Sequence, residues 1–316
     1  MKSIYILSCQ KNGGIYRYFF QNGKLTFLDK TPLDRPMYAI IRGNKLHVIL
    51  RETDANTHFG GYLSFNIAND GSLINKSKMI STNGVCPCYL EAEGDQVYVV
   101  NYLSGNIVKI GEKTVTHKGN SIHPTRQEAP HTHFVCFSPD RQYILCIDLG
   151  IDKIFVYDHN LNEKYEIESP QGSGPRHLCF SHNGEYLYCV NELSNDVSVL
   201  RWNNGKMILK GRYSTIPDFK GESKAAAIRM KGNYLYISNR GADTVSRFKI
   251  IGDKLMLLDN TYCGSAGPRD FDIFDDYIIC TNENSDSVTV LKTENGRPVL
   301  TDEKIEIGNP LCVLKY

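Results

Sequence analysis

Seven residues of the chain have side chains suited to acid–base chemistry. They stand near the ends of short apolar segments, at or next to positions that are equivalent from one segment to another. They are His131, His133, Arg176, His177, Glu192, Arg240 and Arg269. Imidazole, carboxylate and guanidinium groups around one concave site can transfer protons and stabilise developing negative charge. If the fold gathers these residues at one place, they suit acid–base chemistry on an anionic substrate.

The same residues have a structural alternative, in which Arg and Glu side chains form ion pairs that only fasten neighbouring segments. The set differs between segments, whereas fastening devices tend to repeat, and this difference favours a functional site. The two hypotheses predict opposite results. For a site, each substitution lowers kcat/KM at least ~100-fold with little effect on Tm. For fastening pairs, Tm falls and the activity of folded molecules is kept. The test variants are His133→Ala, Arg176→Ala, Glu192→Gln and Arg240→Ala.

These positions belong to a unit that recurs along the chain: an apolar strand, a polar turn, a second strand, a polar tip and a third strand. It reads PRHLCFSHNGEYLYCVNELSNDVSVL at 175–200 and returns at 87–110, 131–157, 223–248 and 268–291, with a degenerate copy from Pro36. The polar residues that end the second strand are spaced by 47, 43, 48 and 43 positions. They are Asn101, Asp148, Asn191, Asn239 and Asn282. One-seventh of 316 residues is about 45, the length of a four-stranded propeller blade.

The two ends of the chain complete the repeat. Residues 4–8 look like a second strand without its first, and residues 310–316 look like a first strand that then stops. Pairing of 4–8 with 311–315 would close a ring and remove its exposed sheet edges. The sequence therefore predicts an all-β fold over residues 1–316: one domain, a seven-bladed β-propeller of four-stranded antiparallel blades.

A propeller would bring the candidate residues together. The first strand of each blade lines the central channel, and the start of that strand lies beside the end of its antiparallel neighbour. All seven residues are therefore expected at one mouth of the channel. The five polar residues that end the second strands are expected to bond local backbone. The remaining histidines show no convergence and are expected at the surface; they include His47, His58, His117, His123 and His182.

Composition excludes several classes of partner. Lys and Arg total 36 against 35 Asp and Glu, a formal charge of +1, so the chain lacks the basic excess of a nucleic-acid binder. No apolar run approaches the ~18 residues of a membrane helix, and the first residues are too quickly polar for a secretory signal. We expect a cytoplasmic protein that binds neither nucleic acid nor membrane.

Ten cysteines do not form a metal or disulfide pattern. Five stand in apolar runs, where a free thiol behaves as a small hydrophobe: Cys136, Cys146, Cys179, Cys189 and Cys280. Cys86 and Cys88 are separated by one residue, which is not the spacing of a metal or redox pair. We expect no metal site, and we expect these five thiols to be buried and slow to react. Cys88 is the expected exception, because its alignment with Arg176 places it near the channel mouth.

The chain resembles the seven-bladed propeller lactonases, a family of bacterial 6-phosphogluconolactonases with the fungal carboxy-cis,cis-muconate lactonising enzymes as relatives. The resemblance runs from about Pro87 to Tyr316 and rests on four motifs. They are APHTHFVCFSPD, GSGPRHLCFSHNGEYLYCVNELSNDVSVL, LYISNRGADTVSRF and GPRDF with NENSDSVTVL. In the first two blades the family usually has Asn-Glu after the second strand, whereas this chain has Leu-Arg-Glu at 50–52.

The resemblance implies hydrolysis of a sugar-acid lactone, most directly 6-phosphogluconolactone, with a small anionic lactone as partner and no metal or other cofactor. It implies four catalytic residues: His133, Arg176, Glu192 and Arg240. His131, His177 and Arg269 are then expected to bind substrate. Either His133 or Glu192 could take the proton from water, and the arginines could stabilise the oxyanion.

Two other functions fit the same fold, because fold alone does not fix activity. One is a cycloisomerase, or a lactonase for another carboxylated lactone, built on the same four residues. The other is a propeller scaffold that binds protein through exposed aromatic or Arg side chains. The sequence does not predict the oligomeric state.

Overall fold

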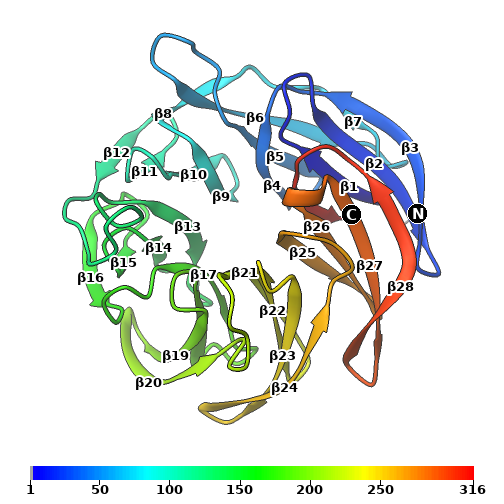
Figure 1. Ribbon diagram of the computed structural model, residues 1–316. Coiled ribbons are helices and arrows are strands. Elements are labelled where there is room, and N and C mark those ends of the chain that lie inside the picture. Colours follow the sequence, from blue (N-terminus) through cyan, green and yellow to red (C-terminus); the bar gives the residue numbers. More distant parts are fainter. Residues whose placement is uncertain (1–2) are drawn as a thin grey trace.

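The structure is a computed structural model that describes residues 3–316. Its strands form seven antiparallel sheets around a central channel, and Figure 1 looks along that channel. The innermost strand of each sheet borders the channel (Figure 1). The predicted seven-bladed propeller is confirmed. Residues 1 and 2 of the predicted domain lie outside the described residues.

The blades follow one another around the ring in chain order. Blade 1 contains β29 (Pro310–Lys315), β1 (Ser3–Ser8), β2 (Gly14–Gln21) and β3 (Lys24–Pro32). Blade 2 contains β4 (Pro36–Arg42), β5 (Lys45–Leu50), β6 (Phe59–Ile67), β7 (Leu73–Ile74) and β8 (Ile80–Val85). Both β7 and β8 pair with β6, so the fourth strand of this blade is in two pieces. Blade 3 contains β9 (Pro87–Glu93), β10 (Gln96–Asn101), β11 (Asn106–Lys109) and β12 (Lys113–Thr116).

The other four blades are regular. Blade 4 contains β13 (Thr132–Phe137), β14 (Ile144–Asp148), β15 (Lys153–Tyr157) and β16 (Glu163–Glu168). Blade 5 contains β17 (Pro175–Phe180), β18 (Tyr186–Asn191), β19 (Asp196–Asn203) and β20 (Lys206–Ser214). Blade 6 contains β21 (Lys224–Lys231), β22 (Tyr234–Arg240), β23 (Thr244–Ile251) and β24 (Lys254–Tyr262). Blade 7 contains β25 (Pro268–Phe274), β26 (Tyr277–Asn282), the 3₁₀ turn η1 (Glu283–Ser285), β27 (Ser287–Glu294) and β28 (Arg297–Glu306).

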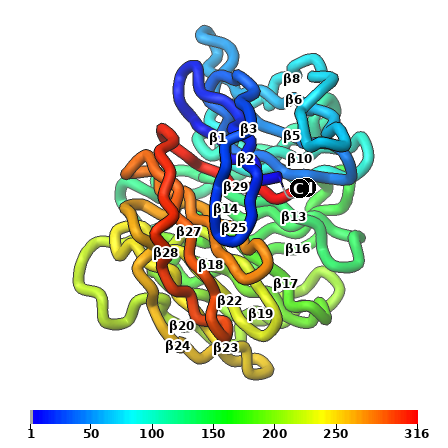
Figure 2. The backbone as a smooth tube through the Cα atoms, turned by 90° about the vertical axis from the view of Figure 1, so that its right-hand side faces the viewer, coloured from blue at the N-terminus to red at the C-terminus, as the bar shows by residue number. Residues whose placement is uncertain are grey.

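The two chain ends close the ring within blade 1. Strand β1 pairs with β29, with Ile4 opposite Lys315 and Leu7 opposite Cys312. Figure 2 shows β1 and β29 side by side in this blade. This pairing confirms the closure predicted from the half-repeats at the ends. Because both edges are paired, the ring has no open sheet edge at the junction.

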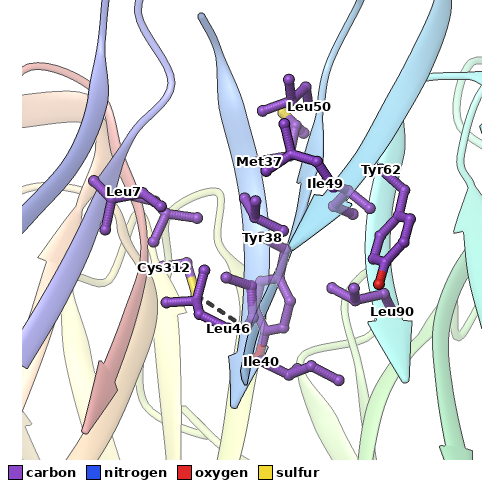
Figure 3. Packing of buried hydrophobic residues seen from close by; sticks show 14 of the residues in the cluster. Leu7, Met37, Tyr38, Ile40, Leu46, Ile49, Leu50, Tyr62, Leu90 and Cys312 are labelled. Carbon is purple, nitrogen blue, oxygen red and sulfur yellow. Dashed lines mark hydrogen bonds between the residues drawn. The ribbon is translucent and has the colours of Figure 1, made fainter. Parts of the chain in front are cut away.

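Apolar side chains pack between neighbouring blades and hold the ring together. In the cluster between blades 1, 2 and 3, Leu7, Cys312, Leu46 and Leu90 converge from different strands (Figure 3). Leu7, Leu46, Leu90 and Cys312 are completely buried. Alternating strand residues supply such clusters at every blade interface, since successive side chains point to opposite faces of a sheet.

Each innermost strand departs from regular pairing near its start. In β17, Pro175 pairs with Asn191 and His177 pairs with Val190, so Arg176 has no partner across the ladder. A bulge of this kind re-aims the extra side chain. We call this extra residue the bulge residue. In the other blades it is Met37, Cys88, His133, Arg269 and Leu311, and in β21 two alanines, Ala226 and Ala227, are skipped.

The five polar residues that end the second strands are completely buried. Asp148 accepts a hydrogen bond from the backbone N of His131 at 2.7 Å, as predicted for a residue that bonds local backbone. Asn191 differs, because its amide donates to side chains on the third strand, at 2.9 Å to Ser198 Oγ. These residues therefore tie adjacent strands of one blade together.

The surface prediction for the isolated histidines is wrong for two of them. His47 is buried 2.8 Å from the Tyr62 hydroxyl, and burial lowers the pKa of His47 to about 4. His117 is buried between Asp148 Oδ2 at 2.7 Å and Tyr157 Oη at 2.8 Å. The repeat pattern did not identify the polar partners of these two histidines. The partner of His47 lies on the adjacent strand, and those of His117 lie in the next blade. The other three follow the prediction more closely, with His58 and His182 exposed and His123 half-buried.

All ten cysteines are free thiols. Cys146, Cys189 and Cys280 are buried as predicted. Cys88, expected to be the exception because of its place near the channel mouth, is buried as well. The burial prediction is wrong for Cys136 and Cys179, which are half-buried because they lie near the ends of β13 and β17.

Among residues 3–316, no helix is long and apolar enough to cross a membrane. The cytoplasmic location expected from the sequence stays a prediction.

Candidate active site

A cavity of about 300 Å³ lies at one mouth of the channel. Six blades and one loop contribute to it. Its walls are Met37, Arg51, Cys86, Cys88, Tyr102, Leu103, Arg126, His133, Glu192, Arg240 and Arg269. Four of the seven residues expected at the mouth line this cavity: His133, Glu192, Arg240 and Arg269.

Two repeated backbone positions supply most of these side chains. The bulge residues of blades 2, 3, 4 and 7 line the cavity. So does the residue that follows the second strand in blades 2, 3 and 5, and in blade 6 the equivalent residue, Arg240, which ends β22. Within blade 5 the two positions meet, because the backbone N of Glu192 donates to the carbonyl of Gly174 at 2.7 Å. The antiparallel hairpin therefore brings residues that are distant in sequence to one mouth.

Glu192 is the centre of a buried ion-pair network. Its carboxylate lies 2.5 Å from Arg126 Nη2, 2.6 Å from Arg240 Nη2 and 3.0 Å from Arg176 Nε. We call these four residues the Glu192 hub. Burial alone would raise the pKa of Glu192, but Arg240, Arg176 and Arg126 hold this pKa well below its usual range. The carboxylate stays charged, and the hub joins blades 5 and 6 to the loop between blades 3 and 4.

A second carboxylate extends the network to blade 7. Glu283 lies 2.9 Å from Arg269 Nη1 and 3.3 Å from Arg240 Nη1. Burial opposes ionisation of Glu283, but Arg269 and Arg240 lower its pKa below the usual value. Arg240 therefore bridges the two carboxylates, and the charged wall runs continuously over blades 5, 6 and 7.

Arg176 lies below the cavity rather than on its wall. It is 2% exposed, and its Nη1 donates to the carbonyl of Ala226 at 2.7 Å. It lines a narrow space of about 10 Å³ beneath the cavity, together with His133 and Arg269. Burial, with the nearby positive charges of Arg240 and Arg269, lowers the pKa of Arg176 to about 9. The predicted catalytic Arg176 thus supports Glu192 from below.

His133 is the titratable group on the wall that can accept a proton. It is 4% exposed, and burial together with the charge of Arg176 lowers its pKa well below 6.5. The ring is therefore neutral at neutral pH. Within residues 3–316, Nδ1 of His133 has no hydrogen-bond partner. A buried, neutral and unpartnered imidazole on a cavity wall can bind a ligand or a water.

The other two predicted substrate-binding histidines do not line the cavity. His131 stacks on Tyr102 with ring centroids 4.4 Å apart and donates from Nδ1 to the Tyr102 carbonyl at 3.0 Å. It supports the wall from behind. His177 lies deeper in the channel because the bulge at Arg176 shifts the side chains that follow.

His177 belongs to a group of rings below the site, which we call the aromatic plug: Tyr38, Tyr89, Phe134 and His177. The ring centroids of Tyr89 lie 4.2 Å from those of Tyr38 and Phe134 and 5.2 Å from that of His177. Burial, with the charge of Arg176, holds the pKa of His177 well below its usual value, so its ring is neutral. The plug forms an uncharged layer in the channel beneath the charged wall.

Sequence reasoning missed two arginines of the cavity. Arg126 stands on the long loop between β12 and β13, which lies outside the repeated unit, and its Nη2 also contacts the Tyr102 hydroxyl at 3.2 Å. Gln127 anchors the loop by donating to the carbonyl of Leu149 at 2.9 Å. Arg51 follows β5, where the chain departs from the family pattern. The unusual length of the loop and that departure were the available signals.

The cavity and its floor carry an excess of positive charge. Five arginines surround two glutamates: Arg51, Arg126, Arg176, Arg240 and Arg269 against Glu192 and Glu283. Guanidinium groups bind carboxylates and phosphates through paired hydrogen bonds. The arrangement suits an anionic ligand with a proton acceptor, His133, beside it. Within residues 3–316, no group of three or more His, Cys, Asp or Glu residues could hold a metal ion.

Comparison with known proteins agrees with this architecture. Residues 3–315 match the family model described as lactonase, 7-bladed beta-propeller. A Staphylococcus saprophyticus protein of uncharacterised function is 33% identical over 332 residues, which cover 95% of this chain and 94% of the relative.

Two solved structures share the fold. A periplasmic gluconolactonase of Pseudomonas aeruginosa has a TM-score of 0.90 at 23% identity, covering 100% of this chain and 99% of the other. A Bacteroides fragilis protein proposed to be a 6-phosphogluconolactonase has a TM-score of 0.88 at 22% identity, covering 100% and 98%. The family match over nearly the whole chain is decisive: the protein belongs to the lactonase family of seven-bladed β-propellers.

Proposed function

We propose that this protein hydrolyses a sugar-acid lactone at the cavity, with 6-phosphogluconolactone as its substrate. The observation that carries the proposal is a neutral, unpartnered His133 on the wall of a cavity rich in arginine. Family membership supports the reaction class. The substrate is suggested by the similarity to proteins described as a gluconolactonase and a proposed 6-phosphogluconolactonase.

His133 is the better candidate for the general base than Glu192. A base must hold a free electron pair at working pH and be able to gain a proton. His133 is neutral and its Nδ1 is unpartnered, whereas three guanidinium groups occupy the Glu192 carboxylate and lower its basicity. We therefore assign proton transfer to His133 and assign to Glu192 the positioning of the arginines.

The reaction then proceeds in two steps. His133 takes a proton from water while the water oxygen forms a bond to the lactone carbonyl carbon, and the carbonyl oxygen becomes an oxyanion. Arg240 and Arg269 line the cavity and can stabilise that oxyanion. When the ring C–O bond breaks, the protonated His133 returns its proton to the leaving alkoxide. The resulting carboxylic acid ionises, so each turnover releases one proton.

The test is a hydrolysis assay on 6-phosphogluconolactone, corrected for spontaneous opening, with unphosphorylated glucono-δ-lactone in parallel. We expect enzymatic opening, and His133→Gln should lower kcat/KM at least ~100-fold. Tm should change little, because Nδ1 of His133 has no protein partner to lose. His131→Gln is the matched control and should cost much less, since His131 packs behind Tyr102 and does not line the cavity. Absence of turnover on both lactones would overturn the proposal.

A further inference from the structure

Arg51 is the arginine of the cavity that no described carboxylate neutralises. Arg126, Arg176 and Arg240 contact Glu192, and Arg269 contacts Glu283. Among residues 3–316, no Asp or Glu oxygen lies within 4.0 Å of the Arg51 guanidinium.

The acid next to Arg51 in sequence is occupied by other side chains. Glu52 lies 3.2 Å from Arg35 Nη1 and 2.9 Å from His58 Nδ1. The Arg51 backbone is fixed, since its N donates to the Arg35 carbonyl at 2.9 Å, while its side chain is exposed on the cavity wall. The backbone of Arg51 is therefore fixed, while its guanidinium forms no ion pair with a described carboxylate.

Strand register makes Arg51 the blade 2 counterpart of Glu192. Pro36 pairs with Leu50 in blade 2 as Pro175 pairs with Asn191 in blade 5, so Arg51 and Glu192 each follow the second strand of their blade. Blade 2 and blade 5 stand on opposite sides of the ring, as the positions of β5 and β17 show (Figure 1). Arg51 therefore faces the Glu192 hub across the cavity.

The wall near Arg51 is apolar. Met37 belongs to the same blade, Cys86 connects that blade to the next one, and Leu103 belongs to the next blade. The cavity thus has a charged end, where oxyanion stabilisation is available, and a distant end with a single free guanidinium. A ligand with one anionic group at each end fits this division of charge.

We propose that Arg51 is an anion subsite that binds a negatively charged tail group, phosphate or carboxylate, on the substrate carbon farthest from the lactone carbonyl. The inference rests on the proposed lactonase function for its orientation, with the reacting carbonyl at the Glu192 hub. A guanidinium binds either anion through paired hydrogen bonds, and a free one gives up no internal ion pair when it does so. Arg51 then selects substrates without taking part in bond breaking.

Binding of unreactive products tests Arg51 separately from catalysis. Calorimetric titrations would compare wild type and Arg51→Ala with three ligands: gluconate, 6-phosphogluconate and glucarate. All three carry a carboxylate for the hub, and only the last two carry a tail anion. We expect Arg51→Ala to weaken 6-phosphogluconate binding about tenfold, the scale of one charge-assisted hydrogen bond, and to leave gluconate unchanged. The loss should shrink at high salt, because exposed charges are screened.

Arg201→Ala is the matched control, since Arg201 is exposed, lies outside the cavity and has no acidic partner among residues 3–316. It removes the same charge and should leave all three affinities unchanged. A glucarate loss equal to that of 6-phosphogluconate would extend the subsite to carboxylate tails, and its absence would restrict the subsite to phosphate. The inference is overturned if Arg51→Ala leaves 6-phosphogluconate unaffected or weakens gluconate equally. Failure of the lactone assay alone would overturn the proposed reaction and leave this binding result standing.

Discussion

The two sides of the ring use the same backbone device for different purposes. In blades 4, 5 and 7 the bulge residues are His133, Arg176 and Arg269, whereas in blades 1 to 3 they are Leu311, Met37 and Cys88. The two arginines need carboxylates that neutralise them, and Glu192 and Glu283 supply these. The apolar residues need only shape and burial.

This contrast changes how the charged residues should be understood. From sequence, catalysis and the fastening of blades were opposed hypotheses. In the structure the Glu192 hub forms part of the cavity wall and of the layer beneath it, and it also connects different blades. One network can therefore serve both catalysis and the fastening of blades. Substitutions within the Glu192 hub should therefore affect stability and activity together, whereas conservative substitutions of the apolar bulge residues should affect neither strongly.

Glu192→Gln should give the largest effect. Three buried or half-buried guanidinium groups lose their carboxylate, and breaking a buried ion pair typically costs about 3–5 kcal/mol. We expect kcat/KM for lactone hydrolysis to fall ~1,000-fold as the arginines lose their positions. Tm should fall too, which replaces the sequence-based expectation of an unchanged Tm. Glu93→Gln, which breaks the exposed pair with Arg141, is the control, and an unchanged Tm for Glu192→Gln would contradict the fastening role.

Acidification tests the neutral histidines of the charged side. The folded-state pKa values of His133 and His177 lie below 6.5, so the unfolded chain binds protons first as the pH falls. Stability should therefore be fully present above about pH 6.5 and decline below it. The acid limb of kcat/KM should lie below the ordinary histidine pKa, with about a tenfold loss per pH unit beyond it. A limb centred above pH 7 would exclude His133 as the base.

Arg126→Ala should have an intermediate effect. Arg126 is one of three cations on Glu192, and its side chain is 26% exposed, so water can replace part of what is lost. We expect kcat/KM to fall about tenfold and Tm to change by less than for Glu192→Gln. Arg126→Lys should restore part of the activity through its charge. An effect as large as that of Glu192→Gln would mean that the loop, not the blades, organises the site.

Met37→Leu should give the smallest effect. Met37 is a buried bulge residue on the apolar side, and exchanging Met for Leu conserves volume at a cost below about 1.5 kcal/mol. We expect kcat/KM within about twofold of wild type, measured with the same lactones. A hundredfold loss would show that the apolar side takes part in the chemistry and would remove the contrast between the two sides.

The sequence predicted the fold well because the repeat carries the information. The spacing of the polar residues that end the second strands and the half-repeats at the termini determine the blade number and the closure through β1 and β29. The same equivalence placed His133, Glu192, Arg240 and Arg269 at one mouth.

Other parts of the site could not be predicted by repeat equivalence. A bulge changes which side chain faces the cavity, so Arg176 lies beneath it and His177 joins the aromatic plug. Arg126 comes from a loop without an equivalent in other blades, and its contact with Glu192 depends on a loop conformation that no period encodes. His117 was assigned to the surface because its partners, Asp148 and Tyr157, lie in the next blade.

The bulge in the innermost strands also bears on how such proteins diversify. The bulge residue makes no pair across the ladder, so its side chain can be exchanged while the strands on either side keep their register. Each blade thus offers one position where a new functional group can be introduced without rebuilding the scaffold. A ring of this kind can acquire a different substrate through a few point substitutions, one blade at a time, and the apolar side of this protein holds the positions that remain open to such change.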